Sequence, residues 1–243
     1  MNIELVGTGS IGAVQMSAST LIDNKILVDL PNGIVKRLKQ TGHNILDIET
    51  CLITHLHGDH FFDIPFFMFE KYFKKATNMT KIICPKGTMN KIKALFDLGF
   101  PEEWNKVSEL ACVEFIEFEE MNEEKITDEL YVTSKLVEHG DLKPAYGYIV
   151  SIQGKNVGFS GDSRLCNNIF DIVEKSEISI LDMSVTDKKT DAHMSLYDIK
   201  EICEKYKDKT IVTTHMHDYT KERAKEEKID NLIVPEDGQI IKI

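Results

Sequence analysis

Short runs of β-branched and aromatic residues recur along all 243 residues of the chain, and this recurrence limits the folds that it can adopt. The runs predict strands at residues 3–6, 20–30 with a turn at Asp23-Asn24, 51–54, 81–84, 113–118, 130–137, 146–152, 156–160, 178–181, 210–213 and 239–243. Helical periodicity lies between them, at residues 33–39, 62–75, 89–98, 167–174, 196–206 and 219–227. Strand groups in each half, punctuated by helices, predict an α/β fold in which two sheets pack face to face with helices outside, a four-layer αββα sandwich.

The composition is that of a soluble globular protein, with 42% hydrophobic and 28% charged residues. No low-complexity tract or linker divides the chain, so we expect a single domain over residues 1–243. The longest strongly apolar stretch, residues 61–69, is interrupted by Asp63 and Pro65 and is far shorter than a membrane span. The first residues lack a basic segment followed by an apolar one, which favours a cytoplasmic protein without a secretory signal.

Charge and cysteine content exclude further classes of protein. The net charge of −11 repels nucleic-acid phosphates, which argues against a general nucleic-acid binder. Residues 71–93 carry seven lysines and no acid. Solvent-exposed faces of helices and loops explain such a run, and a positively charged funnel for an anionic substrate is the alternative. The five cysteines are scattered and never paired as Cys-x-x-Cys, which argues against a disulfide framework and a thiolate zinc site. Cys51 and Cys84 lie in apolar runs and are expected to be small buried residues.

The segment from His55 to His60, with the sequence His-Leu-His-Gly-Asp-His, places four metal-ligand side chains within six positions after an apolar run. At the end of a strand, side chains two residues apart point the same way, so His55 and His57 can bind one ion. A turn at Gly58 can direct Asp59 and His60 toward a second ion. Imidazole and carboxylate suit zinc and related divalent ions, so the segment predicts a two-metal site.

These residues resemble the signature His-x-His-x-Asp-His of the metallo-β-lactamase superfamily, in which isolated ligands follow in a fixed order. The chain has a matching histidine in Glu138-His139-Gly140, a matching acid in Ser160-Gly161-Asp162-Ser163 and a last histidine in Thr214-His215-Met216. The resemblance implies that His55, His57 and His139 hold one ion, that Asp59, His60 and His215 hold the other, and that Asp162 bridges both. It also implies the four-layer αββα fold of that superfamily.

One further histidine, His193, lies between the Asp162 and His215 motifs. The ribonuclease Z and cyclic phosphodiesterase branches of the superfamily have a non-ligand histidine there, near the scissile phosphate. The resemblance therefore implies that His193 is the acid for the leaving group or a phosphate stabiliser; a plain residue at the start of a helix is the alternative. Residues 144–148, Pro-Ala-Tyr-Gly-Tyr, also resemble the strand that follows the equivalent of His139 in those branches.

Other branches fit less well. An acid at Asp162, where two-zinc β-lactamases generally have cysteine, argues against antibiotic hydrolysis, and histidine at position 57 argues against the diiron flavoproteins. Only 22 residues separate His139 from Asp162, which leaves no room for the long arm by which many ribonuclease Z enzymes grip transfer RNA.

The expected function is a phosphodiesterase that cleaves a small or cyclic anionic phosphodiester with a hydroxide bound between two metal ions. Asp59 would orient that nucleophile or take its proton. Zinc is the expected metal, with manganese or iron as alternatives. The alternatives are a ribonuclease Z-type endonuclease at RNA 3′ ends, a thioester or lactone hydrolase similar to glyoxalase II, and a non-catalytic metal-binding protein. Homodimers are common in the resembling branches, so a second copy of the chain is one expected partner, and no membrane partner is expected.

Overall fold

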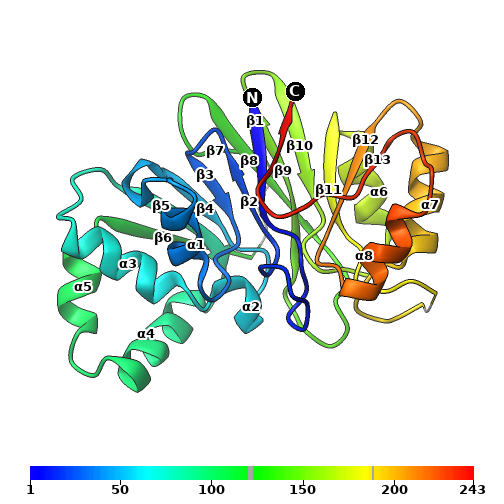
Figure 1. Ribbon diagram of the computed structural model, residues 1–243. Coiled ribbons are helices and arrows are strands. Elements are labelled where there is room, and N and C mark those ends of the chain that lie inside the picture. The colour runs from blue at the N-terminus through cyan, green and yellow to red at the C-terminus, as the bar shows by residue number, and fades with distance from the viewer. Residues whose placement is uncertain (120–122, 188) are drawn as a thin grey trace. The chain divides into compact units, whose positions relative to one another are not determined.

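The computed structural model describes residues 1–119, 123–187 and 189–243, and the chain forms two compact units. The first unit consists of Met1–Gly7, Ser17–Phe118 and Gly238–Ile243, and the second of Thr8–Met16 and Glu119–Asp237. Each unit has its own sheet and its own helices (Figure 1). The α/β class expected from the sequence is confirmed, whereas a single domain over residues 1–243 stays a prediction.

The first unit contains seven described strands in the order β14-β1-β2-β3-β4-β5-β6. They are β1 (Asn2–Gly7), β2 (Ser19–Ile22), β3 (Ile26–Val28), β4 (Thr50–Leu52), β5 (Thr80–Pro85), β6 (Val113–Phe118) and β14 (Gln239–Lys242). Strands β3 to β6 run parallel to one another, whereas β14, β1, β2 and β3 pair in antiparallel fashion. The predicted turn at Asp23-Asn24 is confirmed, because both residues have the positive φ, 46° and 59°, that tight hairpin turns require.

Helices of the first unit are α1 (Ile34–Gln40), the 3₁₀ turn η1 (Ile45–Asp47), α2 (Gly58–Phe61), α3 (Ile64–Phe73), α4 (Thr88–Gly99) and α5 (Trp104–Leu110). The single helix predicted for residues 62–75 is wrong at its start, because α2 ends at Phe61 and α3 begins afresh at Ile64. Pro65 explains the new start, since proline lacks an N–H and fits best in the first turn of a helix. Helix α5 was not predicted. It lies in an acid-rich stretch and buries one apolar side chain, Val107, so its apolar pattern is weak.

The second unit contains seven described strands in the order β13-β12-β11-β10-β9-β8-β7. They are β7 (Glu124–Lys125), β8 (Leu130–Leu136), β9 (Tyr146–Ile152), β10 (Lys155–Phe159), β11 (Ile178–Asp182), β12 (Thr210–Thr214) and β13 (Leu232–Ile233). Strands β10 to β13 are parallel, whereas β7 to β10 are antiparallel. The carboxyl ends of β10, β11 and β12 therefore meet at one edge of this sheet.

The described residues of the second unit form helices α6 (Asn167–Glu174), α7 (Leu196–Lys205) and α8 (Asp218–Lys225). The predicted start of α7 is confirmed as a capping box, in which the Ser195 hydroxyl accepts a bond from the backbone N–H of Asp198 and the Asp198 carboxylate accepts one from that of Ser195. Among the residues that the structure describes, none of the helices has both the length and the apolarity needed to cross a bilayer.

All five cysteines lie among the described residues as free thiols. Cys51 and Cys84 are fully buried, as predicted, and burial raises the pKa of the Cys84 thiol to about 12. Burial likewise raises the pKa of Cys203 to about 11. A thiol with so high a pKa is protonated at neutral pH and is a poor nucleophile.

Gly147 in strand β9 allows helix α6 to lie against the second sheet. A Cβ atom at this position would lie 2.5 Å from the Cδ1 atom of Ile172 and 2.7 Å from the carbonyl oxygen of Phe159. Ile172 belongs to α6 and is fully buried in the core of the second unit. The glycine in the Tyr-Gly-Tyr segment therefore has a packing role, because a larger residue would force the helix and the neighbouring strand apart.

We expect the substitution Gly147→Ala to lower the free energy of unfolding by about 1–3 kcal/mol, because the added methyl group overlaps a backbone oxygen that cannot move alone. Gly99→Ala is the matched control, since a Cβ at Gly99 meets nothing within 4 Å. Urea unfolding followed by circular dichroism measures both variants. Equal free energies of unfolding for the two variants would show that the surrounding residues accommodate the methyl group at position 147 without loss of stability.

Candidate metal centre

In each unit, metal-ligand side chains lie just beyond the carboxyl ends of parallel strands. In the first unit, Asp29 directly follows β3, and the segment from His55 to His60 lies beyond the end of β4. In the second unit, Asp162 follows β10 and His215 follows β12. The carboxyl edge of a parallel sheet is where α/β proteins usually bind ligands, because loops from neighbouring strands meet there.

The first-unit cluster consists of Asp29, His55, His57, Asp59 and His60. The Nε2 atom of His55 lies 3.2 Å from the Nδ1 atom of His57, so these two rings converge as the sequence predicted. The Oδ2 atom of Asp59 lies 3.8 Å from Nε2 of His60. Strand β4 ends at Leu52, so His55 and His57 lie in the loop beyond it. The two rings therefore converge for a reason other than the alternation of side chains along a strand, from which we predicted it. Gly58 is the first residue of α2.

Asp29 orients this cluster through its two carboxylate oxygens. Its Oδ2 atom accepts a bond from Nδ1 of His60 at 2.8 Å and another from the Thr54 hydroxyl at 2.8 Å, while Oδ1 accepts from the Thr54 backbone N–H. The Thr54 hydroxyl, having donated to Asp29, accepts a bond from Nδ1 of His55 at 3.0 Å. In both histidines the proton is therefore assigned to Nδ1, and Nε2 carries the lone pair.

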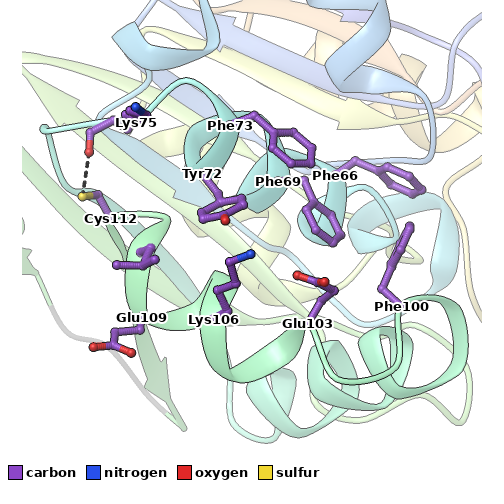
Figure 2. A pocket seen from close by; sticks show the side chains of 12 residues that line it. Phe66, Phe69, Tyr72, Phe73, Lys75, Phe100, Glu103, Lys106, Glu109 and Cys112 are labelled. Carbon is purple, nitrogen blue, oxygen red and sulfur yellow. Dashed lines mark hydrogen bonds between the residues drawn. The ribbon is translucent and has the colours of Figure 1, made fainter.

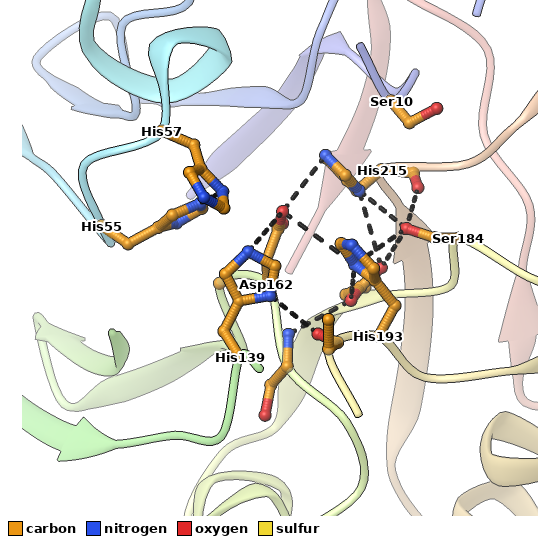
Figure 3. A network of polar contacts seen from close by, with 12 residues as sticks. Ser10, His55, His57, His139, Asp162, Ser184, His193 and His215 are labelled. Atoms are coloured by element: carbon orange, nitrogen blue, oxygen red, sulfur yellow. Dashed lines mark hydrogen bonds and ion pairs between the residues drawn. The ribbon is translucent and has the colours of Figure 1, made fainter. Parts of the chain in front are cut away.

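The second-unit cluster consists of His139, Asp162, Asp182, His193 and His215, together with Ser184. All of these except Asp182 are labelled in Figure 3. One oxygen of Asp162, Oδ2, lies 3.2 Å from Nε2 of His215 and 3.9 Å from Nε2 of His139. Ligand atoms of Asp162, Asp182, His193 and His215 all lie within 4.8 Å of one another. A single carboxylate oxygen thus faces two imidazoles, which is the arrangement that a bridging ligand needs.

The two rings facing Asp162 are fixed through their other nitrogen. Nδ1 of His139 donates to the carbonyl oxygen of Ala192 at 2.8 Å, and Nδ1 of His215 bonds the Ser184 hydroxyl at 2.7 Å. That hydroxyl donates to Oδ1 of Asp182 at 2.8 Å and so accepts from His215. As in the first unit, Nε2 is the nitrogen that carries the lone pair.

Asp182 is a fully buried carboxylate at the last position of β11. Burial alone would raise its pKa, but hydrogen bonds from His193 and His215 outweigh burial and lower the pKa below its ordinary value. Its Oδ2 atom accepts a bond from Nδ1 of His193 at 2.9 Å. Asp182 therefore remains a charged anchor for the histidine beside it.

His193 is half-buried and lies beside Asp162, with 4.0 Å between its Nδ1 atom and Oδ2 of that residue. Burial disfavours its charged form, yet the hydrogen bond and the charge of Asp182 outweigh burial and raise the pKa of His193. Its backbone is held by Thr190, whose hydroxyl accepts from the His193 N–H and donates to the His193 carbonyl. His193 precedes the cap residue Ser195, so it lies in the loop and not at the start of α7.

The donor set suits a divalent metal ion of intermediate hardness. In four of the predicted ligands, Nδ1 is hydrogen-bonded to an oxygen atom, so Nε2 is the nitrogen that can bind a metal ion. Metal-binding histidines are typically held in this way. The four are His55, His60, His139 and His215. Nitrogen and carboxylate oxygen without thiolate match zinc, manganese or iron. Within each unit, the residues present therefore fit a metal site.

Sequence reasoning missed Asp29, Asp182, Thr54 and Ser184, which orient the predicted ligands. Asp29 lay inside the predicted strand 20–30, and Asp182 directly follows the predicted strand 178–181. Each is a lone acid in an otherwise apolar run, Leu-Val-Asp-Leu or Ile-Leu-Asp-Met, and this was the available signal. A buried acid is costly unless it is paired, so an acid in such a run indicates a partner elsewhere in the chain.

A cavity of about 1070 Å³ in the first unit, between α3 and α5, contains none of the predicted ligands (Figure 2). Its lining is mainly aromatic, and the rings of Phe66 and Phe69 each contact the ring of Phe100 edge to face. Of the lysines in residues 71–93 it includes Lys75, whereas Lys71 is fully buried and donates to the Thr80 hydroxyl at 2.8 Å. Lys71 therefore has a structural role and does not belong to a solvent-facing funnel.

Comparison with known proteins identifies the relatives of this chain. A family model described as "Anti-Pycsar protein Apyc1" matches residues 1–238. A ribonuclease Z of Mycolicibacterium gilvum (strain PYR-GCK) is 27% identical over 184 residues, which cover 70% of this chain and 64% of that enzyme. The chain thus spans less than two thirds of the length of this curated relative.

Two solved structures have a similar fold. The metallo-β-lactamase fold protein YhfI from Bacillus subtilis has a TM-score of 0.78 at 15% identity and covers 99% of this chain and 98% of its own. A diphosphatase from the PhnP family has a TM-score of 0.78 at 19% identity and covers 100% of this chain and 97% of its own. These two structures confirm the expected metallo-β-lactamase fold, and the sequence similarity to ribonuclease Z confirms the expected likeness to that branch.

We expect Asp29→Asn to lower the affinity of the protein for Zn²⁺ by about 10–100-fold, because the amide no longer holds the His60 proton on Nδ1. Competition with a chromogenic zinc chelator measures the affinity, and circular dichroism checks that the variant is folded. Asp97→Asn, at an exposed position on α4, is the matched control. A folded Asp29→Asn variant with unchanged affinity would rule out this role.

The raised pKa of His193 predicts a pH dependence. A group with a raised pKa keeps its proton to higher pH, so activity that needs the imidazolium is lost as pH rises through that pKa. Asp182→Asn removes the charge that raises the pKa, and we expect the alkaline limb of kcat to shift to lower pH by about one unit. Asp191→Asn, an exposed position in the same loop, should leave the limb in place. If the alkaline limb of kcat stayed in place in a folded Asp182→Asn variant, Asp182 would not be the group that raises the pKa of His193.

Proposed function

Since the chain belongs to the anti-Pycsar protein Apyc1 family, we propose that it is a metal-dependent phosphodiesterase that hydrolyses a small or cyclic phosphodiester. The family's description names a role against Pycsar and no substrate, so the substrate class is argued from the residues of the site. We extend the anti-Pycsar role to this chain as part of the same proposal.

The proposed ligands follow the order of the sequence motifs. His55, His57 and His139 would hold one ion, Asp59, His60 and His215 the other, and Asp162 would bridge them. The convergence of His55 and His57 in the first unit and the position of Asp162 between two rings in the second support the assignment. Zinc is the proposed metal, with manganese or iron as alternatives. When bound, two such ions activate water and offset the charge of a phosphate.

The observation that carries the proposal is the pairing of His193 with the buried Asp182 beside Asp162. Cleavage of a phosphodiester releases an alkoxide, which needs a proton as the phosphorus–oxygen bond breaks. Asp182 fixes the Nδ1 proton of His193 and favours the charged ring, so Nε2 has a proton to donate to that oxygen. Asp59 is the proposed acceptor for the proton of the attacking water, and it is buried in the first-unit cluster.

A small substrate is favoured by the chain between His139 and Asp162. The described residues there form a turn, strands β9 and β10 and the tight connection at Gln153-Gly154, with no segment left over for a projecting arm. The net charge of −11 also disfavours a long polyanion. The similarity to ribonuclease Z supports phosphodiester chemistry, since a ribonuclease by name cleaves RNA.

The second candidate is an RNA 3′-end endonuclease of the ribonuclease Z type, favoured by the sequence relatives. Thioester or lactone hydrolysis and a non-catalytic metal-binding role remain further alternatives. A homodimer and a cytoplasmic location stay predictions.

We expect protein purified without chelator to hydrolyse bis(p-nitrophenyl) phosphate and to contain about two metal ions per chain. Asp162→Ala should lose both metal and activity, whereas His193→Ala should keep its metal. Because p-nitrophenolate leaves without a proton, His193→Ala should lower kcat little on this diester but by about 10²–10⁴-fold on a 3′,5′-cyclic nucleotide, which releases an alkoxide. Absorbance of p-nitrophenolate and elemental analysis of the same samples give the two readouts.

A panel of 2′,3′- and 3′,5′-cyclic nucleotides and a precursor transfer RNA then separates the candidates. Cleavage of cyclic nucleotides but not of the RNA is the expected result. Selective cleavage of the RNA would replace the leading proposal with the second candidate. Near-normal activity and metal content in Asp162→Ala would overturn the two-metal assignment.

A further inference from the structure

A loop of the second unit, residues 8–16, contacts the segment that carries His215, a proposed metal ligand. His215 has a left-handed backbone conformation, with φ of 55°. This conformation is uncommon for residues other than glycine and persists only where neighbouring groups hold it. Strand β12 ends directly before His215, so the chain beyond it depends on contacts outside the strand.

Main-chain hydrogen bonds join the loop to the residue after His215. The N–H of Met216 donates to the carbonyl of Thr8, and the N–H of Ser10 donates to the carbonyl of Met216, both at 3.0 Å. Gly9 and Met216 therefore form a parallel bridge. Thr8 and Met216 are fully buried, and hydrogen bonds are stronger in such an interior than in water.

Two further contacts join the loop to the residues that follow. The Ser10 hydroxyl lies 2.8 Å from Nδ1 of His217, and the N–H of Val14 donates to the carboxylate of Asp218 at 3.1 Å. Asp218 is the first residue of helix α8. The loop therefore forms a clamp on residues 216–218.

A single carboxylate, Asp237, closes this clamp at both ends. Its Oδ1 atom accepts bonds from the N–H and the hydroxyl of Thr8, at 3.0 and 2.8 Å. Its Oδ2 atom accepts a bond from the N–H of Met16 at 2.8 Å. Hydrogen bonds to a charged acceptor are about twice as strong as those between neutral groups. Asp237 therefore fixes Thr8, the residue whose carbonyl binds Met216.

The inside of the clamp is closely packed. A Cβ atom at Gly9 would lie 2.9 Å from the Cβ atom of Ala13 and 2.9 Å from the carbonyl oxygen of Gln15. The N–H of Gly9 donates to the carbonyl of Met16 at 2.8 Å. Closely packed groups have little room to move independently, so a shift at either end of the clamp is passed on to Met216.

We propose that Asp237 is a positioning residue for the metal site: through Thr8 and Met216, it holds the turn at His215 in the conformation that binds an ion. The inference rests on the proposed function, in which His215 is a ligand. It adds to that site a carboxylate that binds no metal itself and takes no part in bond cleavage.

Cobalt substitution tests the proposal, because the visible absorption of bound Co²⁺ depends on the number and geometry of its ligands. In a folded Asp237→Ala variant, we expect a changed Co²⁺ spectrum and release of Zn²⁺ to excess chelator about 10-fold faster than from the wild-type protein. Circular dichroism checks the fold, and His215→Ala shows the result of losing the ligand itself. Asp208→Ala, at an exposed position before β12, is the matched control and should change neither readout.

A second pair of variants tests the contact with Thr8 and does not depend on the folding of Asp237→Ala. Thr8→Val keeps the shape of the side chain but removes the hydroxyl, which donates to Asp237 and accepts from Lys221 at 3.4 Å. Thr8→Ser keeps that hydroxyl. We expect Thr8→Val to change the Co²⁺ spectrum in the same way as Asp237→Ala but less, and Thr8→Ser to keep the wild-type spectrum.

A purely structural role would give a different result. If Asp237→Ala lowered the free energy of unfolding but kept the wild-type Co²⁺ spectrum and Zn²⁺ release rate, Asp237 would serve folding alone and the proposal would be overturned. The same spectrum in Thr8→Val and Thr8→Ser would also contradict it.

The failure of the proposed function has its own signature. If His215→Ala kept the wild-type Co²⁺ spectrum, His215 would not be a ligand, and the ligand assignment would fail together with this inference. If the metal-loaded wild-type protein hydrolysed no phosphodiester but the spectra changed as expected, the phosphodiesterase proposal would fail and the positioning role of Asp237 would stand.

Discussion

A buried carboxylate at the end of a parallel strand orients the histidine rings in each unit, and the rest of each cluster depends on that bond. Asp29 holds the Nδ1 proton of His60, and Asp182 holds that of His193. A carboxylate removed from water is stable only when donors surround it, so each acid secures the tautomers of its neighbours while they keep it charged. The chemistry of the clusters thus begins with two acids that are themselves not expected to bind metal.

The sheets make this arrangement rigid. Asp29 and His215 have left-handed backbone conformations, with φ of 60° and 55°, and each follows a strand that is hydrogen-bonded on both sides. Such conformations are uncommon for residues other than glycine and cost on the order of 1–3 kcal/mol at constrained sites. The strands hold these turns, so the side chains leave the sheet edge in a defined direction and the clusters need little rearrangement to bind an ion.

The sequence predicted the candidate ligands better than the groups that orient them. His55, His57, Asp59 and His60 lie within six residues, so local geometry alone implied that they lie close together. Asp29 and Asp182 gave a weaker signal, a single acid in an apolar run, and were missed. Two helices were also predicted incompletely. Pro65 divided a continuous apolar pattern into α2 and α3, and α5 was not expected because its apolar pattern is weak.

By itself, the sequence determined the α/β class, most strands, the tight turn at Asp23-Asn24 and the chemical identity and order of the candidate ligands. These depend on side-chain type and on spacing over a few residues. The tertiary structure decided which ring each carboxylate or hydroxyl holds, because Asp29 and His60 are 31 residues apart and Ser184 and His215 are also 31 apart. Pairings over such distances follow from which strands are neighbours in a sheet, and that is a property of the whole folded unit.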